Sequence, residues 1–241
     1  MTDVPVVILC GGRGARLGSV TEDIPKPLIP VGDKPILWHV MKIYAFQGFR
    51  NFILCLGYKG EKIKSYFEKN NNEKWNIRFV DTGMESMKSE RLACVRDFIT
   101  AENFFLAYGD DVADINLHKL LKCHKKKGLI ATITVVKMIS EFGLVKINQH
   151  GIITEFREKP VLNQWMNGGF MVLHKKIFDY LKVGEIEKEV FEKLVSEKQM
   201  GAYKHQRNWK TMNTLKDHAE LNNIWNSGRA FWKQWEDKSN E

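Results

Sequence analysis

The chain has 241 residues, of which 44% are apolar and 27% charged, and its formal net charge is +8. This composition is ordinary for a soluble globular protein with a hydrophobic core, so it excludes a disordered chain. No apolar run approaches the roughly 18 residues that cross a bilayer, and the first residues carry neither a basic region nor a cleavage site. We therefore expect a cytoplasmic protein without a membrane partner.

The positive charge and the cysteines do not indicate a nucleic-acid-binding or zinc-binding module. The lysines fall largely in predicted helices, interleaved with glutamates or apolar residues, and no RNA-binding motif or zinc-finger spacing occurs. Cys10, Cys55, Cys94 and Cys123 are scattered without a C-x-x-C pair, so we expect buried thiols. The sequence thus predicts no nucleic-acid partner.

The first predicted strand leads into a glycine-rich turn. Residues 6–9 are apolar and mostly β-branched, which favours a strand buried on both faces. The glycines of residues 11–14 let the backbone turn sharply and direct its N–H groups at an anion. Arg16 lies inside the turn, and Lys26 follows between two prolines that restrict its position. This pattern predicts a cradle for a polyanion larger than one phosphate.

Two well-known phosphate motifs do not explain this turn. The dinucleotide fingerprint needs a third glycine where Leu17 stands, and the P-loop needs a Gly-Lys-Ser/Thr run that does not occur. A plain structural turn is the remaining alternative, and the two nearby cations argue against it.

Strands and helices alternate in the next part of the chain. Helices are predicted over 36–44, 61–67 and 91–98, and strands over 52–56, 77–80 and 104–108. This alternation is typical of a parallel sheet flanked by helices.

Two aspartates follow the last of these strands. Asp110 and Asp111 come directly after residues 104–108, at the sheet edge where the glycine-rich turn also lies. Carboxylate oxygens at this edge suit Mg²⁺, which keeps most of its waters and shares phosphate oxygens. We therefore predict a metal-binding role for Asp110, and a capping role for Asp114 before a helix over 115–126.

The second half of the chain extends the sheet. Strands are predicted over 130–136, 144–147, 152–156, 166–173 and 201–205, and helices over 175–181, 187–197 and 215–225. The predicted fold class is α/β, with a Rossmann-like, mixed and mostly parallel sheet flanked by helices. Lys159 precedes a proline that favours an extended backbone, so it is either an ordinary exposed lysine or an anchor for a second phosphate. Trp225, Trp232 and Trp235 are predicted packing anchors, in the core or between subunits.

Together these motifs resemble one enzyme family over essentially the whole chain. The resemblance rests on LCGGRGARL, IPKPLIPVGDKPILWHVMKIY, GYKGEKIKSYF, VDTG, YGDDVAD, EFREKP, MNGGFMVL and WNSGRAFWKQW. The chain is similar to the glucose-1-phosphate cytidylyltransferases and their relatives among the sugar-phosphate nucleotidyltransferases. The resemblance implies the nucleotidyltransferase fold, with a catalytic domain over 1–215 and a C-terminal helix and aromatic tail over 216–241. Association through that tail would fit a homo-oligomer.

The reaction implied by the resemblance transfers a cytidylyl group from CTP to a sugar 1-phosphate, with Mg²⁺ as cofactor and pyrophosphate leaving. It needs positioning and charge neutralisation rather than a covalent nucleophile. By the same resemblance, the catalytic residues are Arg16, Lys26 and Asp110. The nucleotide-binding residues are Leu9, Cys10, Gly11, Gly12, Arg13, Gly14, Ala15, Arg16, Lys26, Ser86, Arg91 and Gly109. The sugar-phosphate-binding residues are Lys159 and Asn167, and the metal ligands are Asp110 and Asn213.

Three departures from the family pattern leave alternatives open. Ala15 stands where the family usually has threonine, which removes a phosphate hydrogen bond worth about 1 kcal/mol. Asn213 replaces an aspartate metal ligand with an uncharged carbonyl oxygen, for which Asp111 or Asp217 could compensate. Ser89-Glu90 replaces a glycine pair, and the segment before VDTG is shorter than expected, so the acceptor site could differ. The alternatives are the same fold acting with another nucleotide or a polyol phosphate, and a regulatory nucleotide-binding module that has lost turnover.

Overall fold

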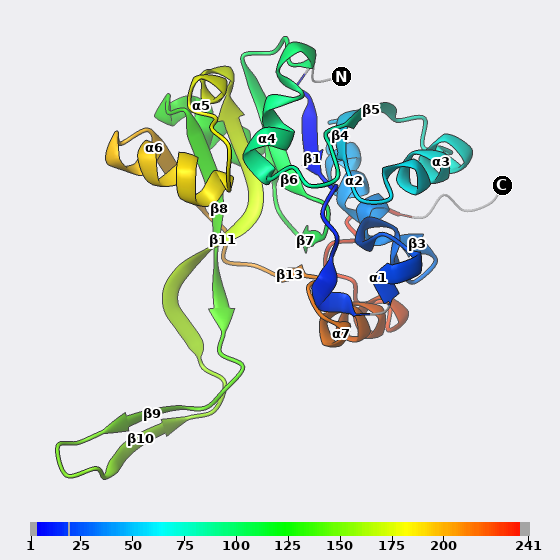
Figure 1. The fold of residues 1–241 in the computed structure, drawn as a ribbon. Helices are drawn as coiled ribbons and strands as arrows, with labels where there is room; N and C mark the ends of the chain where they lie inside the picture. The colour runs from blue at the N-terminus through cyan, green and yellow to red at the C-terminus, as the bar shows by residue number, and fades with distance from the viewer. Residues whose placement is uncertain (1–3, 19, 237–241) are drawn as a thin grey trace.

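A seven-stranded mixed sheet forms the centre of the molecule. The computed structural model describes residues 4–18 and 20–236 (Figure 1). In spatial order the strands are β12 (Met200–Lys204), β8 (Ala131–Ile139), β11 (Val161–His174), β6 (Asn103–Tyr108), β1 (Val6–Leu9), β4 (Asn51–Leu56) and β5 (Asn76–Asp81). Strands β6, β1, β4 and β5 are parallel, β12 is parallel to β8, and β11 runs antiparallel to both β6 and β8. The predicted mixed, mostly parallel sheet is confirmed.

Strand β1 is buried on both faces, as its unbroken apolar run predicts. Its side chains alternate between two hydrophobic cores: Val6 and Ile8 face one, and Val7 and Leu9 face the other. The first core is completed by α2 (Ile36–Phe46), α3 (Gly60–Asn70), α5 (Leu117–Lys127) and α7 (Leu215–Asn226). The second is completed by α4 (Lys88–Ala93), η4 (Lys175–Asp179), η5 (Ile186–Phe191) and α6 (Glu192–Ser196). Helices therefore cover both faces of the sheet.

Several short elements surround the carboxyl ends of the central strands. They are η1 (Ala15–Leu17), α1 (Val20–Asp23), η2 (Lys26–Leu28), β2 (Pro30–Val31), β3 (Lys34–Pro35), β7 (Asp111–Ala113) and β13 (Trp209–Thr211). The turn η3 (Arg96–Phe98) lies instead between α4 and the start of β6. Strands β7 and β13 pair antiparallel, and Thr211 lies opposite Asp111. This pairing brings a late segment of the chain beside the two aspartates that follow β6.

The aromatic tail packs inside the subunit, against helix α2. Trp232 is fully buried, and Trp235 is nearly so. The indole N–H of Trp232 donates to Nδ1 of His39 at 3.3 Å, so the other ring nitrogen of His39 donates to the Val31 carbonyl at 2.8 Å. Burial lowers the pKa of His39 to about 4. The tail tryptophans therefore belong to the core rather than to a free surface.

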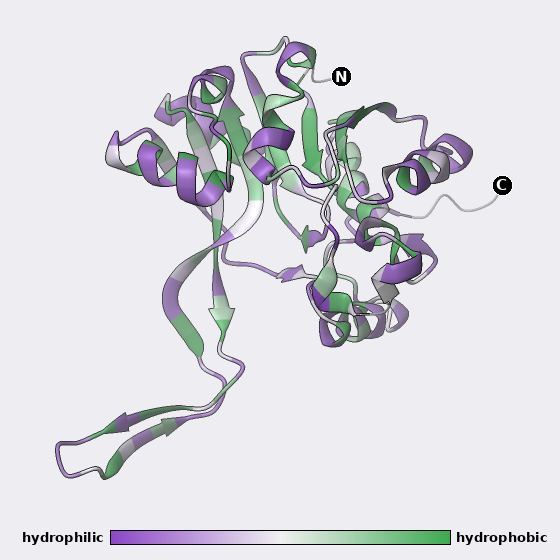
Figure 2. Cartoon of the chain, viewed as in Figure 1, coloured by the Kyte–Doolittle hydropathy of each residue, from purple (hydrophilic) through white to green (hydrophobic). Residues whose placement is uncertain are grey.

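A two-stranded β-arm projects away from the body of the molecule (Figure 1). It consists of β9 (Leu144–Ile147) and β10 (Ile153–Arg157), which pair antiparallel and continue the β8–β11 hairpin outward. Many of its apolar side chains are exposed. Figure 2 colours parts of the arm green, which marks hydrophobic residues. The most exposed apolar side chains on or beside the arm are Ile139, Phe142, Ile147, Ile152, Ile153, Phe156 and Val161.

Two local predictions were wrong. Helix α5 is capped by Asn116, whose side chain accepts from the Lys119 N–H at 2.8 Å, whereas the Asp114 carboxylate is buried against His205 and Arg207. Lys159 is not extended. Its φ is +43°, because it lies in the bend where the arm turns away from the β8–β11 hairpin.

Some helix boundaries also differ from the predicted ones. The helix predicted over 91–98 begins three residues earlier, at Lys88, and ends at Ala93 before the separate turn η3. The helices predicted over 175–181 and 187–197 are a 3₁₀ turn and a π-helix that continues into α6. None of the helices in the described residues is long and apolar enough to span a membrane.

Candidate active site

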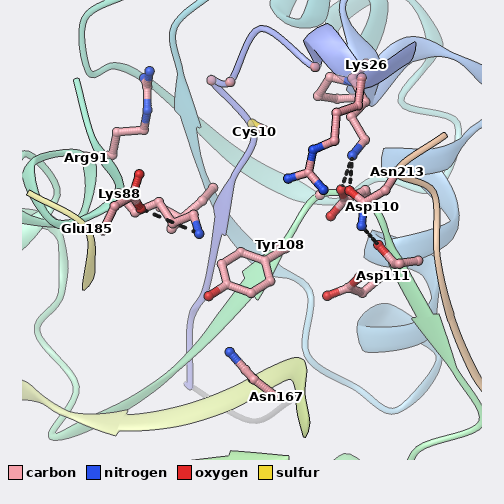
Figure 3. Close-up of a pocket in the computed structure, with 18 of the residues that line it drawn as sticks. Cys10, Lys26, Lys88, Arg91, Tyr108, Asp110, Asp111, Asn167, Glu185 and Asn213 are labelled. Atoms are coloured by element: carbon pink, nitrogen blue, oxygen red, sulfur yellow. Dashed lines mark hydrogen bonds and ion pairs between the residues drawn. The ribbon is translucent and has the colours of Figure 1, made fainter. Parts of the chain in front are cut away.

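A pocket of about 690 Å³ opens at the carboxyl ends of β1 and β6 (Figure 3). Most residues predicted from the sequence to form the site line it: Leu9, Cys10, Gly11, Gly12, Gly14, Ala15, Arg16, Lys26, Ser86, Arg91, Gly109, Asp110, Asn167 and Asn213. Arg13 and Lys159 are not among the lining residues. The pocket therefore joins segments that are far apart in the sequence.

The glycine-rich turn forms one wall of the pocket and passes close to Lys26. Gly14 has a φ of +68°, and a Cβ there would lie 2.8 Å from the Cβ of Lys26, so this position requires glycine. Arg16 is exposed and lines the pocket. The Arg13 side chain turns outward instead and forms an ion pair with Glu85. Any contact from Arg13 to a ligand in this conformation is thus limited to its backbone.

Arg91 shapes the opposite wall by binding backbone carbonyls. Its guanidinium donates to the carbonyl oxygens of Leu56 at 3.1 Å, Gly83 at 2.7 Å and Met84 at 3.1 Å. It also donates to the Thr82 hydroxyl at 2.8 Å, and its side chain is buried. In this structure Arg91 fixes the loop that carries Ser86.

Lys26, Asp110 and Asn213 meet at one point of the pocket (Figure 3). The Lys26 ammonium forms an ion pair with Asp110 and donates to the side-chain carbonyl oxygen of Asn213 at 3.0 Å. The Asn213 amide group donates to the Thr211 hydroxyl at 3.3 Å, which leaves its carbonyl oxygen directed at the cation. Two oxygens supplied by β6–β7 and by the β13 end therefore converge on a single positive charge.

This oxygen pair fits a hard divalent cation. A carboxylate and an amide oxygen are ligands that Mg²⁺ accepts, with water and phosphate oxygens completing its shell. No cluster of three or more His, Cys, Asp or Glu side chains suited to a metal occurs in residues 4–18 and 20–236. A metal held here would accordingly depend on its substrate for several ligands.

Asp111 is buried beside the pocket, and the Asp217 carboxylate is bound at the start of α7. Burial, followed by the neighbouring charge of Asp110, raises the pKa of Asp111 well above its usual range. Asp217 is the partner of Thr214 in a capping box at the start of α7, and its carboxylate also accepts from the Asn213 N–H at 3.0 Å. Asp217 thus positions the Asn213 backbone. The Thr-x-x-Asp spacing is a capping-box signature that could have revealed this from the sequence.

Several lining residues were missed by sequence reasoning. They are Pro27, Met87, Lys88, Tyr108, Met138, Met166, Glu185, Trp209 and Thr211. Tyr108 ends the strand that carries Asp110, so its position beside the pocket could have been predicted. Lys88 and Glu185 approach each other only through the packing of α4 against η5, for which the sequence holds no local signal.

Comparison with known proteins gives a consistent result. The nucleotidyl transferase family profile matches residues 5–237. A Bacillus subtilis protein named probable glucose-1-phosphate cytidylyltransferase is 42% identical, with 95% of this chain and 99% of the relative covered. The glucose-1-phosphate cytidylyltransferase of Salmonella typhi is 37% identical over the same shares of the two chains. Among solved structures, HddC from Yersinia pseudotuberculosis is similar in fold, with a TM-score of 0.73, 24% identity, and coverage of 92% of this chain and 99% of that one.

Proposed function

Because the chain belongs to the glucose-1-phosphate cytidylyltransferase family of nucleotidyl transferases, we propose that it transfers a cytidylyl group from CTP to a sugar 1-phosphate. The products are a CDP-sugar and pyrophosphate, and glucose 1-phosphate is the first acceptor to test. The observation that carries this proposal is the meeting of the glycine-rich turn with Lys26, Asp110 and Asn213 in one pocket.

The roles proposed for these residues follow from charge and position. The backbone of residues 9–15 cradles the nucleotide, with Ser86, Arg91 and Gly109 around it. Arg16 and Lys26 neutralise the charge that develops on the departing pyrophosphate. In-line attack by the acceptor phosphate needs no protein nucleophile, so the protein contributes orientation and electrostatic stabilisation.

Asp110 and Asn213 are the proposed Mg²⁺ ligands, since their oxygens already converge on a cation. A bound Mg²⁺ would polarise the phosphate oxygens at the reacting centre. With a metal held by this oxygen pair, the Lys26 ammonium would be available to the polyphosphate. Asn213 brings no negative charge, so we expect weaker metal binding here than at a site with two carboxylates.

Acceptor binding is assigned to Asn167, which lines the pocket, and to Lys159, which does not. Lys159 lies at the base of the arm with its side chain exposed. Lys159 does not reach the pocket of its own chain. We therefore propose that it binds phosphate only in an assembly, in which the arm lies against a second copy of the chain. The exposed apolar side chains of the arm support such a homo-oligomer. We further propose a cytoplasmic location, and residues 216–241 as an extension of a catalytic domain over 1–215.

Pyrophosphate release by the purified protein tests the proposal. The assay contains Mg²⁺ and pairs CTP, UTP, dTTP, GTP or ATP with glucose 1-phosphate and with a panel of other sugar and polyol phosphates. Turnover with CTP and one acceptor is expected, and Asp110→Ala should abolish it. CTP binding without turnover for any acceptor, with turnover restored by Asn213→Asp, would instead support the regulatory nucleotide-binding module.

A further inference from the structure

A pair of opposite charges lines the pocket at the end away from the phosphate-binding cations (Figure 3). Lys88 comes from the start of α4, and Glu185 directly precedes η5. The Lys88 ammonium lies 3.6 Å from Oε2 of Glu185. In Figure 3 the two side chains lie on the side of Arg91, whereas Lys26, Asp110 and Asn213 lie across the pocket.

Neighbouring residues hold this pair in place. The Lys88 ammonium also lies 2.5 Å from the Glu187 carboxylate, and it sits 5.0 Å from the centre of the Tyr108 ring. The Tyr108 hydroxyl donates to the same Glu187 oxygen at 2.6 Å. Burial works against ionisation of Glu187, but the bonds from Lys88 and Tyr108 outweigh it and lower its pKa. Lys88 is therefore a fixed ammonium donor rather than a mobile surface lysine.

Glu185 presents a free acceptor to the pocket. Its Oε2 is shielded from solvent and makes no hydrogen bond within the described residues, while its side chain as a whole is 44% exposed. The side chain of Glu185 thus stays partly open at the pocket that it lines. An ammonium donor and a carboxylate acceptor stand side by side on the pocket wall.

The position of the pair relative to the glycine-rich turn indicates which part of a nucleotide reaches it. The turn runs along the pocket between Arg91 on one side and Lys26 on the other (Figure 3). A nucleotide with its phosphates at Arg16 and Lys26 extends along this turn toward the opposite end. That end is formed by Ser86, Met87 and Lys88 from one continuous segment. The group placed there is the base.

We propose that Lys88 and Glu185 read the pairing edge of the base and select cytosine over uracil, an inference that rests on the proposed function and deepens it. Cytosine carries an amino donor at C4 beside an acceptor at N3, and these match a carboxylate beside an ammonium. Uracil carries an acceptor at C4 beside an N–H at N3, so each of its groups would face a like partner. Unpaired polar groups at a desolvated contact give strong discrimination.

The test compares the binding of CTP and UTP, which have the same phosphates, to the wild-type protein and to variants in the absence of acceptor. Dissociation constants are measured by titration calorimetry with Mg²⁺ present. The wild type should prefer CTP by a factor of about 10 to 100. Glu185→Gln should reduce this ratio about tenfold, because its amide can turn to donate to uracil. Lys88→Met should reduce it as well, because it removes the donor to cytosine and the repulsion of the uracil N–H.

Glu189→Gln is the matched control, since Glu189 is an exposed carboxylate of the same η5 segment and does not line the pocket. It should keep the wild-type CTP/UTP ratio. Equal affinity of the wild type for the two nucleotides would overturn the inference and leave nucleotidyl transfer intact. An unchanged ratio in Glu185→Gln, with a raised KM for the acceptor, would overturn it too and would assign the pair to the acceptor. Failure of the wild type to bind any nucleoside triphosphate would remove the proposed function itself.

Discussion

At the scale of single residues, Lys26 occupies the point at which the two proposed metal ligands converge. Its ammonium is the only partner that the structure gives to the Asp110 carboxylate within the described residues, and it is shared with Asn213. A divalent cation bound at the proposed site would therefore compete with the lysine for the same oxygens. The charge at position 213 decides how favourable that exchange is.

Asn213→Asp should tighten divalent cation binding. A second carboxylate adds a negative charge where the amide oxygen now supplies only a dipole, so we expect the dissociation constant for Mn²⁺ to fall about tenfold or more. Electron paramagnetic resonance of free Mn²⁺ measures this without turnover. Asn226→Asp places the same charge on an exposed position of α7 outside the pocket and should have no effect. Equal Mn²⁺ affinities in all three proteins would argue against Asn213 as a ligand.

The stability of the protein should depend on pH through His39. Its pKa of about 4 in the folded protein lies below the value of 6.5 for a free histidine, so the unfolded chain binds the extra proton between these values. The stabilisation is complete above about pH 6.5 and is lost as the pH falls toward 4, by up to about 1.4 kcal/mol per pH unit. Urea unfolding of the wild type and of His39→Gln at about pH 7 and pH 5 measures the effect. Identical pH dependences in the two proteins would show that His39 is not responsible. The pKa of His124 is also lowered to about 4, but His124 is present in both proteins, so its contribution is the same in each.

The site residues predicted from the sequence are those that lie next to a recognisable local pattern, such as the end of a strand or a glycine-rich turn. Asp110 was found because it follows an apolar strand, and Lys26 because prolines flank it next to a glycine turn. For Tyr108 the sequence predicted only the last position of that strand. No sequence pattern predicted that Lys88, Glu185 and Glu187 lie together, because their contact forms only when two helices on the same face of the sheet pack against each other.

At the scale of elements, β11 connects the pocket to the arm. It is 14 residues long. Its last residues pair with both β6 and β8, whereas its first residues pair with β8 alone and lead into the arm. Gly169 lies where the register shifts, with a φ of +80°. A Cβ there would lie 1.9 Å from the Asp111 carboxylate, so the strand approaches the floor of the pocket too closely for any side chain.

Gly169→Ala should therefore be more damaging than an alanine at another glycine of positive φ. Gly128, at the end of α5, has a φ of +62°, and a Cβ there would point into open space, so Gly128→Ala should cost only about 1 kcal/mol of backbone strain. Gly169→Ala adds a collision with Asp111 and should cost at least about 2 kcal/mol more. Urea unfolding measures both. Equal losses of stability would mean that β11 can shift away from Asp111 freely.

Elements with a continuous apolar pattern were predictable, and very short ones were not. The runs in β1, β4 and β6 were located within a residue or two. Strands β7 and β13 have three residues each, too few to show a period, and they are stabilised by pairing with each other. The strand predicted over 166–173 begins earlier, at Val161.

At the scale of the whole molecule, the arm carries many of the exposed large apolar side chains of the described chain. Phe142 is 75% exposed and Phe156 63%, values unusual for phenylalanine in an isolated globular protein. The tail tryptophans, by contrast, are buried within the subunit. If the chain associates with itself, the arm is the better candidate for the contact surface.

Replacing the arm's apolar side chains should weaken self-association. We expect the wild type to sediment as an oligomer and the triple variant Phe142→Ser, Ile147→Ser, Phe156→Ser to shift toward the monomer, because the apolar area buried in the contact is lost. Analytical ultracentrifugation measures this. Val183→Ser, at an exposed valine outside the arm, should leave the assembly unchanged. A monomeric wild type would contradict the proposal.

At the pocket and beside it, residues near the start of the chain contact residues near its end, and these contacts influence the order in which the protein folds. Lys26 and Asn213 are 187 positions apart, and the contacts of Pro30 with His218, Gly32 with Asn222 and His39 with Trp232 span 188, 190 and 193 positions. Closing such loops is entropically costly and slow, so these contacts form late. A refolding chain can hold a complete glycine-rich turn while it still lacks Asn213. Recovery of nucleotide turnover should therefore lag behind recovery of the circular dichroism signal, and the lag would report the docking of the C-terminal segment.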